Sequence, residues 1–189
     1  MRIGICGGTF DPFHRGHLEP VLAVRNTLGW DCVLYVPAAQ QPFKSRRDSA
    51  SGYHRFAMAQ LATRSHDDVW VTPLELERSG TSYTVDTLEE LHARHPDAAF
   101  DWIIGDDNVA EFDRWKSPER LLALARFVVL TRSGAASDPR FTYAKNDVVA
   151  VSSTEIRRRV RAGEAIDPFV DPLVSRYIHH NGLYKEDQS

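Results

Sequence analysis

The spacing of apolar segments constrains the fold of this chain more than any other feature of its sequence. Short apolar runs rich in β-branched residues recur along it, at residues 3–6, 33–36, 69–71, 102–104, 127–130 and 148–151. Each run is continuously apolar rather than alternating, which is typical of strands that are covered on both faces. The pattern therefore predicts strands buried inside a layered fold.

Amphipathic stretches lie between these runs. Leu18, Val21, Leu22 and Leu28 fall on one side of a helix that Gly29 would end. By the same kind of pattern we expect helices at residues 17–28, 53–64, 84–91, 118–125, 153–162 and 172–180. Alternating strands and helices imply right-handed βαβ units. The predicted fold is α/β, a Rossmann-like doubly wound parallel sheet with helices on both faces.

The length of 189 residues is that of one domain, and no linker divides it. We therefore expect a single domain of residues 1–189, in which the helical part from about residue 152 caps the sheet. Two polar segments rich in turn formers, 37–52 and 132–146, are expected to be loops. Ligands of such sheets bind beyond the carboxyl ends of the strands, so functional residues should directly follow strands.

Composition excludes several classes of protein. The net charge of −3 argues against a protein that coats nucleic acid, and no apolar run is long enough to cross a membrane. The chain starts without the pattern of a signal peptide, and its two cysteines, Cys6 and Cys32, lie in strand-like runs. We expect a cytoplasmic protein with buried free thiols and with neither a membrane nor a nucleic acid as partner.

The first predicted strand leads into the segment GGTFDPFHRGHL, residues 7–18. The glycine spacing of the common dinucleotide-binding fingerprint is absent from it. Gly7 and Gly8 nevertheless allow the backbone to approach a ligand, and Thr9 and Phe10 can present N–H groups to a phosphate. This segment is the first candidate for a phosphate site.

His14 and His17 stand three residues apart where the next helix is expected to begin. Imidazole N–H groups beside a helix N-terminus suit a polyphosphate. A helix cap or a packed loop histidine is the structural alternative, and zinc is disfavoured because no third ligand accompanies the pair. We assign no metal ligand to the protein.

The segment 7–18 resembles the signature of the nucleotidylyltransferase superfamily, in which a pattern [H/T]-x-G-H follows the first strand. Four later segments narrow the resemblance to bacterial nicotinate-nucleotide adenylyltransferases: SGTSYTVDTL (79–88), IIGDDNVAEFDRW (103–115), SSTEIRRRV (152–160) and YIHHNGLY (177–184). They follow the order found in the family and extend the resemblance from residue 7 nearly to the end of the chain.

Two residues of the segment 152–160 suit an anion. Ser153 can cap a helix through its hydroxyl, and Arg157, one turn further on, can fork onto phosphate oxygens. The alternative is a plain cap followed by solvated arginines, and Arg158, Arg159 and Arg161 are expected at the surface. The resemblance implies that Ser153 and Arg157 hold the triphosphate of ATP.

Gly105 follows an apolar run and would leave space for a sugar or base, while Asp107 can accept hydrogen bonds from ribose hydroxyls. The Trp115 indole can stack on a pyridinium ring with a cation–π contribution of ~0.5–2 kcal/mol, although it could equally be an ordinary core residue. The resemblance assigns Trp115 to the pyridine pocket.

Thr84 is expected to begin a helix, so its backbone N–H would be free to bind a carboxylate. The resemblance implies that backbone amides around Thr84 and Lys116 grip the nicotinate carboxylate; Tyr83 either lines that pocket or packs below it. One departure follows the second strand, where Phe43 replaces the family's usual histidine and Lys44 is retained to reach a phosphate.

The resemblance implies transfer of an adenylyl group from ATP to nicotinate mononucleotide, which gives deamido-NAD and pyrophosphate, with Mg²⁺ carried by ATP. It implies catalytic roles for His14, His17 and Arg157. The implied ATP site comprises Gly7, Gly8, Thr9, Phe10, His14, His17, Gly105, Asp107, Ser153 and Arg157, and the implied pyridine nucleotide site comprises Lys44, Tyr83, Thr84, Trp115 and Lys116. The alternatives are adenylylation of nicotinamide mononucleotide or another phosphate, such as phosphopantetheine, and a nucleotide sensor without turnover.

Overall fold

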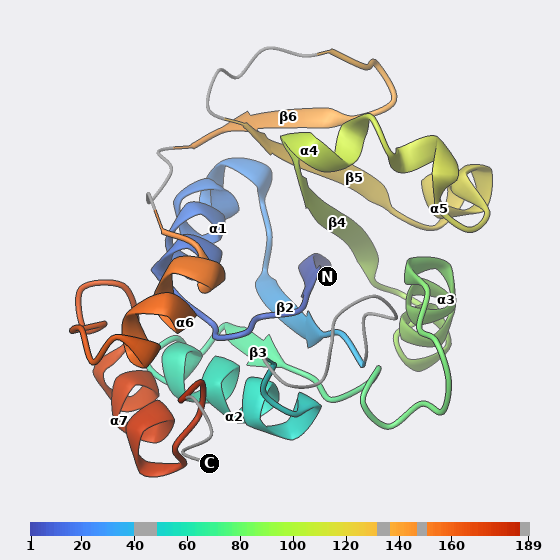
Figure 1. Ribbon diagram of the computed structural model, residues 1–189. Helices are drawn as coiled ribbons and strands as arrows, with labels where there is room; N and C mark the ends of the chain where they lie inside the picture. Colours follow the sequence, from blue (N-terminus) through green and yellow to red (C-terminus); the bar gives the residue numbers. More distant parts are fainter. Residues whose placement is uncertain (40–48, 132–136, 147–150, 186–189) are drawn as a thin grey trace.

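The computed structural model describes residues 1–39, 49–131, 137–146 and 151–185. In this part of the chain six parallel strands form one sheet, ordered β3-β2-β1-β4-β5-β6 (Figure 1). The strands are β1 (Arg2–Gly8), β2 (Cys32–Pro37), β3 (Val69–Val71), β4 (Ala99–Gly105), β5 (Arg126–Thr131) and β6 (Thr142–Lys145). The strand order reverses between β1 and β4, which places the topological switch point there. The predicted doubly wound parallel sheet is confirmed.

Helices cover both faces of the sheet (Figure 1). They are α1 (Arg15–Leu28), α2 (Gly52–Thr63), α3 (Thr84–Arg94), α4 (Asp106–Val109), α5 (Pro118–Leu124), α6 (Ser153–Arg161) and α7 (Pro172–His180), with a short 3₁₀ turn η1 (Phe112–Arg114). One apolar core contains residues of α1, α2, α6 and α7, and a second contains residues of α3, α5 and η1. The sheet therefore has a separate core on each side.

Strand β2 illustrates why the strand sequences are continuously apolar. Val33 and Tyr35 belong to the core on the α1 side, whereas Cys32, Leu34 and Val36 belong to the core on the α3 side. Successive side chains of a strand point to opposite faces. Because both faces are covered, both sets are apolar.

The sixth strand of the described chain lies before the last apolar run. Of the run 148–151 only Val151 is among the described residues, and it is not in a strand. Strand β6 (Thr142–Lys145) instead lies inside the segment 132–146, which we expected to be a loop, so that expectation is wrong. Strand β6 is at the edge of the sheet and only partly buried, which removes the need for a continuous apolar run.

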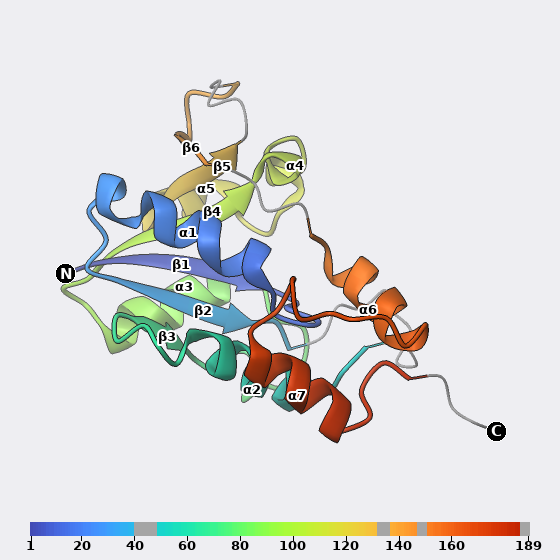
Figure 2. The ribbon, with the colours of Figure 1, turned by 90° about the vertical axis from the view of Figure 1, so that its left-hand side faces the viewer.

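The C-terminal helices confirm the predicted helical cap. Helix α6 lies past the arrowheads of β1 and β2, at the end of the sheet where ligands bind in such folds (Figure 2). Helix α7 packs against α2 through the core on the α1 side. The cap therefore contributes side chains to the region that follows β1.

Candidate active site

The loop after β1 has an unusual backbone. Phe10 adopts a left-handed conformation with φ of 52°, and the peptide bond between Asp11 and Pro12 is cis. Left-handed geometry costs a bulky residue about 1–2 kcal/mol, and such strain is often found at functional sites. The Phe10 ring is buried and offsets the strain through contacts with Phe13, Tyr35 and His17 at centroid distances of 5.0–5.6 Å.

His14 and His17 stack at the N-terminus of α1. Their ring centroids are 3.6 Å apart and their planes differ by 20°. The backbone N–H of His14 donates to Nδ1 of His17 at 3.2 Å, so the proton of a neutral His17 ring is on Nε2. Nδ1 of His14 is buried and has no hydrogen-bond partner in the described chain. His17 thus takes part in capping the helix, while Nδ1 of His14 has no partner among the described residues and stays a candidate contact for a ligand.

Both imidazoles are neutral around pH 7 in this structure. Burial lowers the pKa of His14 from 6.5 to about 4. Burial, followed by the charge of a protonated His14, holds the pKa of His17 well below its ordinary range. A bound polyanion would favour protonation of both rings.

Two further residues, Tyr35 and Gly16, shape the surroundings of the two histidines. The Tyr35 hydroxyl, on β2, donates to the main-chain carbonyl of His17 at 2.9 Å. Gly16 leaves room for the His14 ring and for Val151, because a Cβ at Gly16 would lie 3.1 Å from both. The glycine between the histidines thus lets the lead-in to α6 approach them.

Helix α6 is joined to the same loop by the two residues predicted to bind phosphate. Ser153 Oγ donates to the carbonyl of Pro12 at 3.1 Å, and Arg157 Nη1 donates to the carbonyl of Asp11 at 2.7 Å. The expectation that Ser153 caps the helix is wrong, since the Ser152 hydroxyl accepts from the N–H of Glu155. Nε of Arg157 is buried without a partner among the described residues.

The neighbouring arginines behave differently from Arg157. Arg158 and Arg159 form ion pairs with Glu155 and Glu164 on the outer side of α6. The prediction that these two arginines are surface residues agrees with this arrangement. Only Arg157, of the three, reaches the loop after β1.

A cavity of about 310 Å³ lies at the switch point. Five of the predicted site residues line it: Gly7, Gly8, Thr84, Gly105 and Trp115. A Cβ at Gly7 would lie 2.5 Å from the Trp102 ring, so this position must be glycine for the strand ends to pack as they do. The structure therefore brings the end of β1 and the predicted pyridine pocket to one place.

The predicted pyridine residues lie on the α3 side of this cavity. Thr84 is the first residue of α3, so its N–H lacks an intrahelical acceptor. Trp115 packs against Phe112 and Phe127 and also lines the cavity, so it is both a core residue and a wall of the pocket. Its two proposed roles are compatible.

Tyr83 and Lys116 pair with each other at the surface. The Lys116 ammonium lies 4.6 Å from the centroid of the Tyr83 ring and 2.8 Å from Oδ1 of Asp86. The Tyr83 side chain is 45 % exposed and does not line the described cavity. The side chain of Lys116 is therefore occupied by Asp86, which leaves its backbone as the candidate contact.

Asp107 follows β4 on the short helix α4 and is exposed. Its Oδ1 accepts from Nδ2 of Asn108 at 3.0 Å and lies 2.6 Å from where a Cβ of Gly105 would be. Asn108 itself lines the cavity. Asp107 is thus placed at the cavity's edge rather than in its wall.

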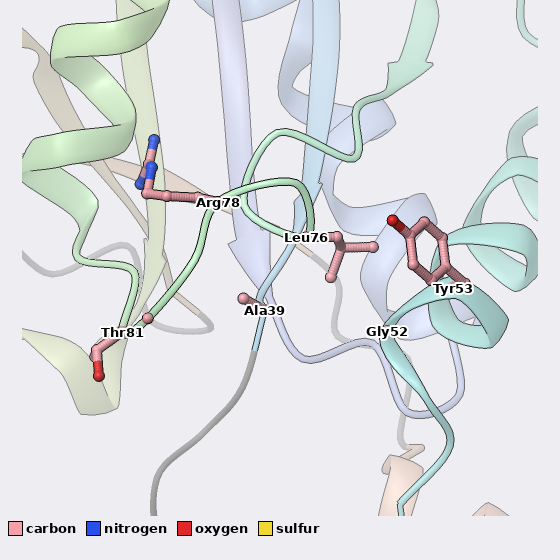
Figure 3. A pocket seen from close by; sticks show the side chains of 7 residues that line it. Ala39, Gly52, Tyr53, Leu76, Arg78 and Thr81 are labelled. Atoms are coloured by element: carbon pink, nitrogen blue, oxygen red, sulfur yellow. The ribbon is translucent and has the colours of Figure 1, made fainter.

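A second hollow, of about 460 Å³, adjoins the first, and Thr81 lines both. It lies between the start of α2 and the segment before α3 (Figure 3). The guanidinium of Arg78 points away from Tyr53 and Leu76, and it is bound to Glu90 and to the hydroxyl of Thr87 (Figure 3). This hollow extends the site towards Ala39.

Sequence reasoning missed Asp11, Arg55 and Tyr184. The Asp11 carboxylate is buried and accepts from the Tyr184 hydroxyl at 2.6 Å. Arg55 is buried beside the same loop and donates to the carbonyl of Thr9 at 2.5 Å. Asp11 and Tyr184 lie within the quoted segments 7–18 and 177–184, which was an available signal; Arg55 had none.

Two residues singled out in the sequence, Phe43 and Lys44, lie outside the described residues. Within the described ranges, no three side chains of His, Cys, Asp or Glu gather as a metal site. Over the same ranges, no helix has the length and apolar character needed to cross a membrane.

Comparison with known proteins identifies the family. A family described as cytidylyltransferase-like matches residues 5–159. A probable nicotinate-nucleotide adenylyltransferase of Gemmatimonas aurantiaca is 42% identical over 198 residues, covering 98% of this chain and 93% of the relative. One of Salinibacter ruber is 38% identical and covers 98% of both chains. The Plasmodium falciparum nicotinic acid mononucleotide adenylyltransferase complexed with NaAD has the same fold, with a TM-score of 0.79, 22% identity and 97% coverage of both chains. With two such relatives matching over nearly its full length, the chain belongs to the nicotinate-nucleotide adenylyltransferases of the cytidylyltransferase-like family.

Proposed function

We propose that this protein transfers the adenylyl group of ATP to nicotinate mononucleotide, which gives deamido-NAD and pyrophosphate. One observation carries the proposal: a tryptophan-lined cavity lies where the loop after β1 begins, and stacked histidines at a helix N-terminus lie where it ends. The first arrangement suits a polyphosphate and the second a flat ring. Membership of the family supplies the identity of the two substrates.

The reaction needs no general base. The 5′-phosphate of nicotinate mononucleotide has a second pKa of about 6 and is largely dianionic at neutral pH. One of its oxygens attacks the α-phosphorus of ATP, the bond from that phosphorus to the bridging oxygen breaks, and pyrophosphate leaves with the electron pair. The protein must therefore bring two anions together in line and stabilise charge on the leaving group.

We assign that stabilisation to His14, His17 and Arg157, assisted by Ser153 and by the N–H groups of Thr9 and Phe10. His14 and Arg157 each have a buried polar atom without a partner among the described residues, which supports the assignment, because buried polar atoms are normally hydrogen-bonded. We place the ribose or base near Gly105 and Asp107, and a phosphate near Lys44. Mg²⁺, bound to triphosphate oxygens and water, would neutralise charge on ATP. A metal carried in this way requires no cluster of ligands on the protein.

The pyridine ring is proposed to stack on Trp115, with its carboxylate on the N–H groups of Thr84 and Lys116. Donors without acceptors satisfy a carboxylate but leave the NH₂ of a carboxamide unpaired. This gives a physical reason to prefer the acid over the amide. The same preference distinguishes adenylylation of nicotinate mononucleotide from adenylylation of nicotinamide mononucleotide.

The test is pyrophosphate release with ATP and Mg²⁺, with either nicotinate or nicotinamide mononucleotide as acceptor. We expect kcat/KM for the acid to exceed that for the amide by at least tenfold, the value of one unpaired polar group. Equal values would refute the assignment of the acid site. Tight ATP binding without pyrophosphate release from either acceptor would instead identify a nucleotide sensor.

A further inference from the structure

The chain on either side of residues 40–48 is attached to the end of β1 and to the loop that follows it. On one side, the N–H of Ala38 donates to the carbonyl of Gly8 at 2.8 Å. On the other, Ser49 Oγ and the N–H of Ala50 donate to the Asp11 carboxylate at 2.7 and 3.0 Å. Both flanks thus meet the end of β1 or the loop after it, to which we assign part of the ATP site.

Arg55, in the first turn of α2, lies where these three stretches of chain converge. Its Nη1 donates to the carbonyl of Thr9 at 2.5 Å. Its Nη2 donates to the carbonyls of Ala38 and Ala39 at 2.6 and 3.2 Å, and its Nε donates to that of Ala50 at 3.3 Å. One guanidinium therefore bonds the β1 loop and both flanks at once.

Burial makes this arrangement demanding. Arg55 is only 4 % exposed, and a buried charge is costly unless its donors are satisfied. Burial lowers the pKa of Arg55, which the charge of Asp11 opposes. The planar guanidinium offers five donors in a rigid fork, whereas a lysine offers three donors from a single atom. Only arginine can make all four contacts in this geometry.

The Asp11 carboxylate closes the network from the other side. It accepts from Ser49, Ala50 and the Tyr184 hydroxyl, while the Asp11 carbonyl accepts from Arg157. One residue thus connects a flank of 40–48, the cap and a proposed ATP ligand. Any shift of Asp11 would also move Arg157.

Packing of α2 is provided elsewhere on that helix. Met58, Ala59 and Ala62 bury its apolar face in the core on the α1 side. The polar contacts of Arg55 are made to main-chain carbonyls of loops and not to the helices or strands that form that core. Its contacts therefore bear on the placement of the loops more than on the docking of the helix.

We propose that Arg55, with Asp11 opposite it, is a positioning residue that holds the ATP loop in register with both flanks of residues 40–48. It touches neither substrate and acts through the backbone of Thr9 and Asp11. The inference rests on the proposed adenylyl transfer and extends it. In-line transfer between two bound anions is sensitive to small displacements, since a misplacement of about 1 Å can cost roughly 100-fold in rate.

The test compares Arg55→Lys with Arg64→Lys. Arg64 ends the same helix and pairs with Asp171 at the surface, so it controls for the substitution itself. We expect Arg55→Lys to lower kcat at least tenfold while the Kd of each substrate, titrated alone, changes less than threefold. Arg64→Lys should stay within twofold of wild type. All rates are taken well below the midpoint of thermal unfolding of each variant.

Two outcomes would overturn the proposal: a kcat for Arg55→Lys within twofold of wild type, or a loss of kcat that merely equals the loss of folded protein. If Arg55→Lys does not fold, Tyr184→Phe tests the same network by deleting one donor to Asp11. Its kcat should fall about three- to tenfold, and an unchanged kcat would overturn the proposal. The wild type separates the two hypotheses: an inactive wild type refutes adenylyl transfer, whereas an active wild type with an equally active Arg55→Lys refutes only the role of Arg55.

Discussion

The two ends of the candidate site, one at the histidines and one at Trp115, differ in how firmly hydrogen bonds within the protein already hold them. Around the histidines, Arg55 and Arg157 donate to carbonyls of the loop after β1, and Tyr35 donates to the carbonyl of His17 in the first turn of α1. Beside Trp115, by contrast, lies an open cavity, and Thr84, the first residue of α3, lines it. One end is fixed in advance and the other offers space.

We therefore expect the histidine end to govern the rate of transfer and the cavity to govern affinity and selectivity. Donors that are fixed before the reaction stabilise developing charge, so they act on the rate. A cavity with a flat aromatic wall discriminates by shape and by unpaired polar groups, so it acts on affinity and selectivity. Substitutions at the histidine end should lower kcat, and substitutions at the cavity should weaken the pyridine nucleotide.

The largest effect is expected at His17. His17→Ala should lower kcat roughly 10²–10³-fold, the usual result of losing a transition-state donor, and should alter the Kd of nicotinate mononucleotide far less. His17→Asn is the matched variant, because its carbonyl can still accept from the His14 N–H. If His17→Asn restores the wild-type rate, the residue serves only as a cap, and the comparison of the two ends fails.

The second effect is on stability and concerns His14. Its pKa of about 4 lies below the unfolded value of 6.5, so the unfolded chain binds more protons between these values. Stability should therefore fall as pH falls from 6.5 to 4, by up to about 3 kcal/mol from this residue. In His14→Gln, unfolding midpoints measured across this range should depend less on pH, while His95→Gln, at an exposed position, should behave as wild type. Identical slopes for His14→Gln and wild type would contradict the burial of a neutral ring.

The third effect tests the backbone at the cavity. Thr84→Pro deletes one N–H at a helical position where proline is well tolerated, and Tyr83 before it is already extended. Loss of a hydrogen bond to a charged group should weaken nicotinate mononucleotide roughly 10–100-fold and leave ATP unaffected.

Two controls accompany Thr84→Pro. Thr84→Val keeps the amide, and Lys116→Ala removes a side chain that is paired at the surface with Asp86. Each should change the Kd of nicotinate mononucleotide less than threefold, Thr84→Val because the N–H is kept and Lys116→Ala because an exposed ion pair contributes little. Unaltered affinity in Thr84→Pro, measured by calorimetric titration, would show that this amide does not bind the acid.

The smallest effect is expected for stacking. Trp115→Ala should weaken nicotinate mononucleotide roughly 3–30-fold, equivalent to ~0.5–2 kcal/mol, and ATP by less. Trp115→Phe keeps a ring and should lie between Trp115→Ala and wild type. Equal losses for both ligands, with a matching fall in thermal stability, would make Trp115 a core residue only.

Most of the fold could be predicted because buried parallel strands have a direct sequence signature. The strand at Val69–Val71 and the helix at Pro172–His180 lie where the pattern places them. Strand β6 escaped because an edge strand is covered incompletely and can include polar residues such as Thr142 and Lys145. Its neighbour in the sheet, not its own apolarity, makes it a strand.

The site was predictable where side chains carry its chemistry and hidden where they bind backbone. His14, His17 and Trp115 stand out as residue types. Arg55 does not, because the carbonyls it binds belong to Thr9, Ala38, Ala39 and Ala50, and any residue could supply them. Ser153 was predicted as the cap where Ser152 is found, because adjacent serines have the same chemistry and only the residue at which the helix begins separates them.

The hydrogen bond between Tyr184 and Asp11 joins residues 173 positions apart. Contacts of such long range form after most of the intervening chain has been ordered. A growing polypeptide could pair its early strands while still on the ribosome, yet Asp11 would lack this partner until residue 184 had been synthesised. Competence for catalysis would then require synthesis to have passed residue 184, so that chains that stop before it would be folded in part but inactive.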